Sequence, residues 1–222
     1  MIFGAAKTED ATVVGLIAGA LRRDISFGTL PPDGKLKIAD LRARYGGSNH
    51  SIREALRLLT AEGLVAAEAQ RGFRVTSATQ ADLEDITRIR VEVERIGLTW
   101  ALANGDTAWE GRVMAAHHAL RKAEDAIAAH ADDLAALAWD EALRAFFAAL
   151  MSASGSPRLI EAHETYYDQS RRIRLSALRE GTLNFAARRA RHAALVEAVL
   201  ARDEAAALTA LTHEIQGELA GT

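Results

Sequence analysis

A short polar run, residues 48–57, carries the side chains best suited to binding another molecule. Asn49, His50, Arg53 and Arg57 fall within about two turns of a predicted helix. When the apolar residues of this helix face a core, these four side chains are left outward, mostly near the N-terminal end. Asn, His and Arg can hydrogen-bond to base edges and phosphates, so the pattern predicts contact with a DNA major groove.

Two predicted helices, joined by a glycine turn, would position this run. The earlier helix places Ile38, Leu41 and Tyr45 on one face and ends at Gly46-Gly47, where glycine can take the left-handed conformation. Ser48 or Asn49 can cap the later helix, which ends near Gly63. Its predicted buried stripe consists of Ile52, Ala55, Leu56 and Leu59. Helix, glycine turn and helix together predict a helix-turn-helix.

The flanking segments complete a winged fold. An earlier helix, with Val13, Val14, Ile17 and Leu21 at helical spacing, should stop before the turn at 27–34. Two short strands are expected near 64–68 and 73–76, and a hairpin after a helix-turn-helix is a wing. At its tip, Arg71 and Gly72 could approach a phosphate or the neighbouring minor groove.

Charge and composition differ between the two parts of the chain. Residues 1–78 hold 11 Lys/Arg and 8 Asp/Glu, whereas residues 79–222 hold 16 and 22, so the parts have opposite net charge. The absence of cysteine excludes disulfide scaffolds, thiolate metal sites and cysteine nucleophiles. No apolar run approaches the roughly 18 residues of a membrane span, and residues 1–10 lack a secretory pattern, so we expect a cytoplasmic protein with no membrane partner.

The second part, residues 79–222, is rich in alanine and has helical periodicity throughout. Six helical segments are expected near 80–104, 107–130, 132–152, 157–179, 183–201 and 203–219. The predicted fold is therefore mainly α: a winged helix-turn-helix domain over residues 1–78, followed by an all-α six-helix bundle over residues 79–222.

The first part resembles the winged-helix domain of GntR-type bacterial transcription regulators. The matching pieces, in order, are LPPDGKL at 30–36, SNHSIREAL at 48–56, AEGLV at 61–65 and RGFRV at 71–75. The resemblance implies DNA contacts by Ser48, Asn49, His50, Ser51, Arg53, Arg57, Arg71 and Gly72. The family usually has Arg at the position of Asn49; because Asn can pair with adenine, the operator is expected to deviate from the common one.

The second part resembles the effector domain called FCD, in the six-helix form of the VanR branch of FadR-type regulators. The matching pieces are RVEVE at 90–94, Phe146-Phe147, ASGSPRL at 153–159, His192 and His213. This resemblance implies a small-molecule effector domain that also dimerises. The effector-binding residues expected from it and from their chemistry are Arg90, Phe147, Arg171, Arg174, His192 and His213.

Many FCD domains hold a divalent metal through one Asp and three His. Here His192 and His213 match two ligand positions, whereas the usual Asp and His positions are Leu143 and Phe147. Two imidazoles without a carboxylate make a poor site, so we expect a degenerate one with the histidines hydrogen-bonded to neighbours or to an anionic ligand. Asp140 or His163 could complete a site, although no spacing requires it.

The apolar replacements favour an effector bound by hydrocarbon and by arginine. Arg90, Arg171 and Arg174 are candidates for a carboxylate because the planar guanidinium donates two parallel hydrogen bonds. As the alternative, each is an ordinary ion-pair residue of a helix surface.

These observations predict a ligand-responsive, homodimeric regulator that binds a double-stranded DNA operator, with repression favoured over activation. The alternative is a protein-interaction or enzymatic helical domain whose winged helix does not bind DNA specifically. No HExxH, P-loop or GxSxG motif occurs, so we expect no enzyme. The sequence does not identify the effector, the operator or the regulated genes.

Overall fold

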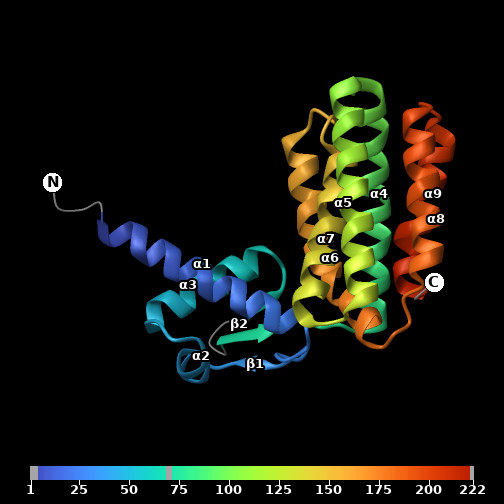
Figure 1. Ribbon diagram of the computed structural model, residues 1–222. Helices are drawn as coiled ribbons and strands as arrows, with labels where there is room; N and C mark the ends of the chain where they lie inside the picture. The colour runs from blue at the N-terminus through green and yellow to red at the C-terminus, as the bar shows by residue number, and fades with distance from the viewer. Residues whose placement is uncertain (1–4, 69–71, 221–222) are drawn as a thin grey trace. The chain divides into compact units, whose positions relative to one another are not determined.

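The computed structural model describes residues 5–68 and 72–220, and the side chains of residues 13–68 and 72–218. The chain divides between Asp82 and Leu83 into two compact units, which are described separately below (Figure 1). The first contains three helices and a small sheet, and the second contains the long helices. This confirms the predicted fold class of a winged helix-turn-helix followed by a helical bundle.

The first unit is built on α1 (Ala5–Ser26), α2 (Ile38–Tyr45) and α3 (Asn49–Ala61). Its core is apolar and includes the whole predicted stripe of α3, in which Ile52, Leu56 and Leu59 have no exposed surface. Val13 of α1, in contrast, is 37% exposed and lies outside this core. Hydrophobic burial therefore holds α3 by one face and leaves its other face available.

The turn between α2 and α3 depends on two glycines. Gly46 ends α2 with φ 76°, and Gly47 follows with φ 78°, both in the left-handed region that disfavours other residues. A Cβ on Gly47 would also lie 2.8 Å from Cδ1 of Ile17, so the close approach of the turn to α1 requires glycine. Ser48 then caps α3, because its hydroxyl accepts a hydrogen bond from the Ser51 amide at 3.0 Å.

Three short strands form the wing sheet: β1 (Lys35–Leu36), β2 (Val65–Glu68) and β3 (Gly72–Val75). They are antiparallel in the order β1-β3-β2, with Leu36 opposite Phe73 and Val65 opposite Val75. The predicted hairpin is confirmed. The sequence analysis did not predict β1, since two residues are too few to show the alternation that marks a strand.

Six helices make up the second unit: α4 (Gln80–Asn104), α5 (Thr107–Ala129), α6 (Asp133–Met151), α7 (Pro157–Arg179), α8 (Phe185–Leu200) and α9 (Glu204–Ala220). They match the six predicted segments and run side by side in Figure 1. The starts of α5, α6, α7 and α8 are fixed by side-chain caps from Asp106, Asp132, Ser156 and Asn184. Among the described helices, none combines the length and apolarity needed to cross a membrane.

Candidate nucleic-acid interface and buried ionic centre

The outer face of α3 carries the predicted recognition side chains. Asn49, His50, Arg53 and Arg57 are all exposed, and all but Arg57 lie in the first turn and a half of the helix. Arg57 forms an ion pair with Glu54 on the same helix. The N-terminal half of α3 therefore presents an amide, an imidazole and a guanidinium to a ligand outside the unit.

Ser51 does not share this outer face, which corrects the prediction that it contacts DNA. Its side chain is buried at 4% exposure, and its hydroxyl hydrogen-bonds with the hydroxyl of Ser48 at 2.8 Å. The two serines together provide the hydrogen bonds that cap the start of α3. Ser51 thus supports the recognition helix from inside, and Ser48, although exposed, is occupied by the cap.

Of the two predicted DNA contacts in the wing, the structure describes only one. Arg71 lies outside the described residues. Gly72 opens β3, is exposed and has φ 92°, a conformation that suits glycine.

The buried carboxylate of Asp24 links α1 to the end of α2. It accepts a hydrogen bond from the Tyr45 hydroxyl at 2.6 Å and forms an ion pair with Arg44 at 2.6 Å. Burial and the neighbouring Asp24 raise the pKa of Tyr45, so the hydroxyl stays protonated and remains a donor. Because Tyr45 ends α2 just before the glycine turn, this anchor helps to hold the turn in place.

The second unit has charged side chains in its interior. Among its described residues, ten Arg, His, Asp and Glu side chains are buried: Arg90, Glu94, Glu124, Asp140, His163, Arg174, Arg188, His192, Glu214 and Glu218. We call this set the ionic centre. Arg90, Arg174 and His192 were predicted effector contacts, and Asp140 and His163 were possible metal ligands. The other five members had not been predicted as site residues: Arg188, Glu94, Glu124, Glu214 and Glu218.

Each buried arginine of the ionic centre has a carboxylate partner of its own. Arg90 Nε lies 2.9 Å from Glu94 Oε1, one helical turn along α4. Arg174 Nε of α7 lies 2.9 Å from Asp140 Oδ1 of α6. Because buried charges are tolerated only when paired, these contacts set the positions of the guanidinium groups.

Arg188 of α8 is paired in the same way. Its Nη2 lies 2.6 Å from Glu214 Oε1 of α9. Burial would raise the pKa of Glu214, but Arg188 and His192 outweigh it and lower that pKa to about 2.

Glu218 of α9 is shared by all three arginines. Its Oε2 accepts a hydrogen bond from Arg90 Nη1 at 2.6 Å and lies 3.5 Å from Arg174 Nη1. Its Oε1 lies 3.9 Å from Arg188 Nη2. One carboxylate therefore stands among guanidinium groups contributed by three other helices.

His192 lies between two buried carboxylates. Its Nε2 is 3.1 Å from Glu214 Oε1, and its Nδ1 is 3.7 Å from Glu124 Oε1. Burial would lower the pKa of His192, but the hydrogen bonds to Glu124 and Glu214 outweigh burial and raise it. His192 therefore adds positive charge to the centre more readily than a free imidazole.

Aromatic rings border the ionic centre. Phe147, a predicted effector contact, is fully buried and lies against Tyr167 and His192, with ring centroids 5.9 and 6.4 Å apart. The guanidinium of Arg174 lies 3.9 Å from the Tyr167 ring centroid, and that of Arg90 lies 4.9 Å from it. Stacking on an aromatic face further fixes these two arginines.

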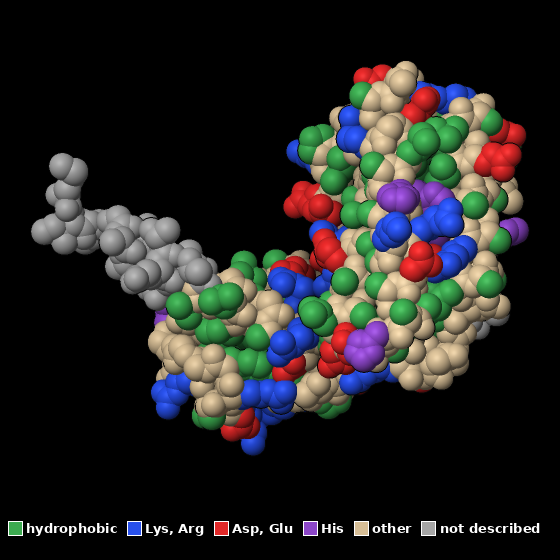
Figure 2. Space-filling view, viewed as in Figure 1, with side chains coloured by type: hydrophobic (Ala, Val, Ile, Leu, Met, Phe, Trp, Pro, Cys, Tyr) green, Lys and Arg blue, Asp and Glu red, His purple; other side chains and the backbone are tan. Residues whose placement is uncertain are grey.

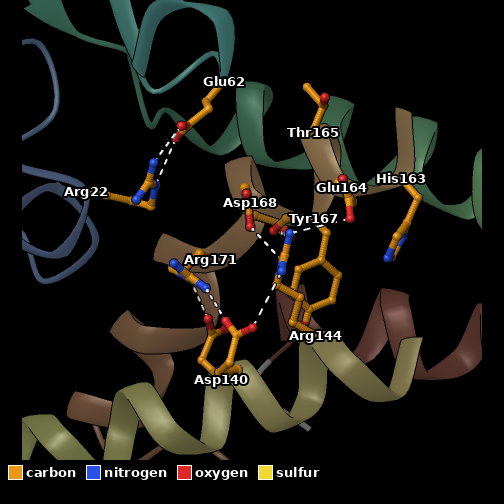
Figure 3. A network of polar contacts seen from close by, with 12 residues as sticks. Arg22, Glu62, Asp140, Arg144, His163, Glu164, Thr165, Tyr167, Asp168 and Arg171 are labelled. Carbon is orange, nitrogen blue, oxygen red and sulfur yellow. Dashed lines mark hydrogen bonds and ion pairs between the residues drawn. The ribbon is translucent and has the colours of Figure 1, made fainter. Parts of the chain in front are cut away.

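Arg171, another predicted effector contact, stands at the edge of the centre. Figure 3 shows it pointing from α7 toward Asp140, with which it forms an ion pair, and it also contacts Glu141. Its side chain is 13% exposed, whereas Asp140 is fully buried. Arg171 thus covers the outer side of a carboxylate whose inner side is bound by Arg174.

His213 is not part of this centre, which corrects two predictions for it. The side chain is exposed, so it neither lines an effector site nor ligates a metal beside His192. The neighbouring Glu214 takes the inward position on α9. Adjacent residues of a helix point about 100° apart, and the periodicity of α9 left the choice between them open.

The ionic centre does not fit a divalent metal. Leu143 and Phe147, which stand at two ligand positions of the family pattern, are fully buried and apolar. Among the described residues, no three His, Asp or Glu side chains are arranged to hold an ion. The alternative ligands are occupied as well, because Asp140 is bound by two arginines and His163 Nδ1 lies 3.3 Å from Glu94.

Several buried polar atoms of the centre have no hydrogen-bond partner among the described residues. The donors are Arg90 Nη2, Arg188 Nε, Nη1 and Nη2, and the Tyr167 hydroxyl. The carboxylate oxygens are Glu94 Oε2, Glu124 Oε1, Glu214 Oε1 and Glu218 Oε1, and nitrogens of His163 and His192 also have no hydrogen-bond partner. Buried polar groups of native proteins are nearly always hydrogen-bonded, so these atoms could take a further polar partner. By contrast, the bundle face seen in Figure 2 mixes hydrophobic, acidic and basic side chains.

Comparison with known proteins gives the same two-part division. Residues 15–75 match the family described as bacterial regulatory proteins, gntR family, and residues 85–217 match the FCD domain. The HTH-type transcriptional repressor GlaR of Escherichia coli is 36% identical over 190 residues, covering 84% of this chain and 85% of GlaR. The uncharacterized regulator BphR of Paraburkholderia xenovorans is 37% identical over 186 residues, covering 82% and 74%.

Solved structures share the fold. The structure of E. coli McbR/YncC aligns with a TM-score of 0.72 at 23% identity, covering 94% of this chain and 95% of that one. A GntR regulator from Rhodococcus sp. RHA1 aligns with a TM-score of 0.71 at 24% identity, covering 93% and 95%.

Proposed function

Because the chain belongs to the GntR family of bacterial regulatory proteins and carries an FCD domain, it is a transcriptional regulator, and we propose that it is a homodimeric repressor released by a carboxylate-bearing metabolite. The first unit would bind the operator, and the second would bind the effector and the second copy. We place the protein in the cytoplasm, where operator DNA lies.

The exposed N-terminal half of α3 is the observation that carries DNA binding. Asn49, His50 and Arg53 stand on one helix end, held from behind by the serine cap and the apolar core. Arg53 suits guanine and Asn49 suits adenine, so these residues are proposed to read base edges. Arg57 and the wing would contribute phosphate contacts and a strong dependence on salt.

Unpartnered guanidinium donors support a carboxylate as the effector. The five buried carboxylates, Glu94, Glu124, Asp140, Glu214 and Glu218, are surrounded by three buried arginines and by Arg171, Arg189 and Arg191 at the edge. The raised pKa of His192 favours its positively charged form. Glu141 and Asp125 contact Arg171 and Arg189 on the outer side, so the charges of the centre and its edge nearly balance. Arg90 and Arg188 keep N–H donors without a hydrogen-bond partner among the described residues, which favours a ligand with two acceptor oxygens.

An apolar stripe on α4 supports the homodimer. Ile89, Ile96 and Trp100 are 39%, 45% and 45% exposed, and their spacings of seven and four residues put them on one side of the helix. A second copy of α4 would cover this stripe in a symmetric contact, and two-fold symmetry would present two recognition helices to a pseudo-palindromic operator.

The test is selection of bound sequences from random duplex DNA, followed by affinity measurements on the selected operator. Arg53→Ala should weaken specific binding by about 1–3 kcal/mol and relax the preference at one base pair in each half-site. Arg112→Ala, an exposed arginine of α5, is the matched control and should leave operator affinity unchanged. Equal affinity of Arg53→Ala and the wild type would remove Arg53 from the interface.

A further inference from the structure

We propose that Arg90, Arg174 and Arg188 form a carboxylate receptor that Glu218 occupies in the absence of effector, and that the effector's carboxylate binds by displacing Glu218. This inference rests on the proposed function for the identity of the effector. It adds the atoms that bind the carboxylate and a competitor built into the chain.

The first argument is the difference between private and shared carboxylates. Each of the three arginines lies 2.6–2.9 Å from a carboxylate that contacts neither of the other two, on its own helix or on a neighbouring one. We call these carboxylates private in that sense, although Asp140 is also bound by Arg171 and Glu214 by Arg191. Those pairs would keep the three guanidiniums charged and in place without Glu218. Glu218 is therefore the exchangeable anion of the cluster, and a ligand carboxylate in its place would restore the same charge.

The second argument is that Glu218 fills the receptor incompletely. Only Oε2 accepts hydrogen bonds, from Arg90 at 2.6 Å and from Arg174 at 3.5 Å, while Oε1 has none and lies 3.9 Å from Arg188. Arg90 Nη2 and Arg188 Nε and Nη1 remain without a hydrogen-bond partner among the described residues. A carboxylate not tied to α9 could adopt the bidentate geometry that an arginine fork favours, and it would thereby gain contacts that Glu218 lacks.

The third argument is the position of Glu218 in its helix. It lies in the last turn of α9, which ends at Ala220, whereas the private partners Glu94, Asp140 and Glu214 lie further inside their helices. Unwinding one terminal turn breaks few backbone hydrogen bonds. Glu218 can therefore withdraw at small cost and leave room for a ligand in an otherwise closely packed interior.

The decisive experiment is rescue of Glu218→Ala by acetate, which matches the CH₂–COO⁻ fragment that the substitution removes. The full-length variant should melt about 10 °C below the wild type. Sodium acetate should restore at least half of this loss in a saturable manner, whereas sodium chloride at equal ionic strength and neutral acetamide should not. Glu218→Gln, whose side chain still fills the space, should not respond to acetate beyond the chloride control.

Two further variants decide the cases that melting leaves open. If Glu218→Ala does not fold alone, recovery of folded protein on refolding in acetate rather than chloride gives the same answer. Arg188→Ala combined with Glu218→Ala should lose the acetate response, and Glu92→Ala, an exposed glutamate of α4, should never show one. An acetate response no larger than that of chloride would overturn the receptor.

Competition is tested with a series of straight-chain mono- and dicarboxylates, measured by calorimetry. Each carboxylate that binds should bind Glu218→Ala at least tenfold more tightly than the wild type, because the competitor is gone. Equal affinity would overturn displacement. If acetate rescue holds but no carboxylate releases operator DNA, the proposed effector response fails while the receptor stands, so the two failures are distinguishable.

Discussion

The two units of this protein have opposite interiors. The core of the winged-helix unit is apolar, and its charged side chains point outward, with Asp24 as the buried exception among its described residues. Among its described residues, the helical unit buries ten Arg, His, Asp and Glu side chains, contributed by α4 to α9. The apolar core supports α3 from one side and leaves the polar side chains of this helix on the surface. The ionic core of the helical unit instead holds its charged side chains inside, paired with one another.

The two interiors also differ in how the stability of each unit depends on pH and on anions. Apolar packing responds little to pH or to anions, which suits a unit that must present the same helix end at all times. Buried ion pairs depend on every partner, because removing one charge leaves the other uncompensated. The helical unit is therefore the part of the chain whose stability can be coupled to a small charged molecule.

The largest effect should come from removing a cation of the ionic centre. Arg174→Ala leaves Asp140 and Glu218 short of a partner and should lower the unfolding free energy by about 3–5 kcal/mol, measured by urea denaturation. Arg57→Ala breaks an exposed pair and should cost less than about 1 kcal/mol. Similar losses for the two variants would mean that the ionic centre is no more sensitive than the surface.

A core substitution in the winged-helix unit should be nearly as costly, for a different reason. Leu56→Ala creates a cavity in a fully buried position and should cost about 2–5 kcal/mol. Because no charge is involved, the loss should not change with pH or with added carboxylate. A loss that carboxylates reverse would contradict the contrast between the two interiors.

The loss of stability at acidic pH should come from the helical unit. The pKa of Glu214 is lowered from 4.5 to about 2 in the folded state, so its stabilisation is complete above pH 4.5 and is lost as pH falls toward 2. The loss is on the order of 3 kcal/mol. Urea denaturation at a series of pH values should show it, and Glu214→Gln should flatten that part of the profile.

His192 contributes with the opposite sign. Its pKa is raised above 6.5, so its stabilisation is present at lower pH and is lost as pH rises through the folded-state pKa. His192→Gln should remove this decline at alkaline pH. An unchanged alkaline limb would show that His192 stays neutral in the folded protein.

The smallest effect concerns the start of the recognition helix. Ser48→Ala removes the N-cap of α3 and should cost about 1 kcal/mol of stability. Operator affinity should fall slightly, since the first turn carrying Asn49 and His50 becomes easier to unwind. Ser48→Asp should retain the cap, and hydrogen exchange of the first α3 amides would compare the three proteins directly.

Much of the fold could be predicted because its signals are local. The stripe of α3, the glycine turn and the six long helices follow from periodicity and from residues that end helices, and the structure has them within a few residues. The strand β1 was not predicted because two residues are too few to show the alternation of a strand. The family resemblance implied a DNA contact for Ser51, whereas packing turned this side chain toward Ser48.

The site in the helical unit was only partly predictable. Arg90, Arg174 and His192 were identified from residue type and family pattern. Except for Glu94, which lies on α4 with Arg90, the carboxylates that contact them come from other helices. Arg188 could have been suspected from its helical spacing of four residues before His192. Nothing local distinguished Glu214 from His213, because a weakly amphipathic helix does not show which of two neighbours faces inward.

By itself, the sequence determined the two-part architecture, the family and the side chains offered at the start of α3, because helix periods, turns and caps depend on residues close together in the chain. Only the tertiary structure decided which charges meet inside the bundle. Pairing of buried ions depends on the register between helices up to 128 residues apart, as for Arg90 and Glu218. That register is set by the packing of whole helices, which no short stretch of sequence contains.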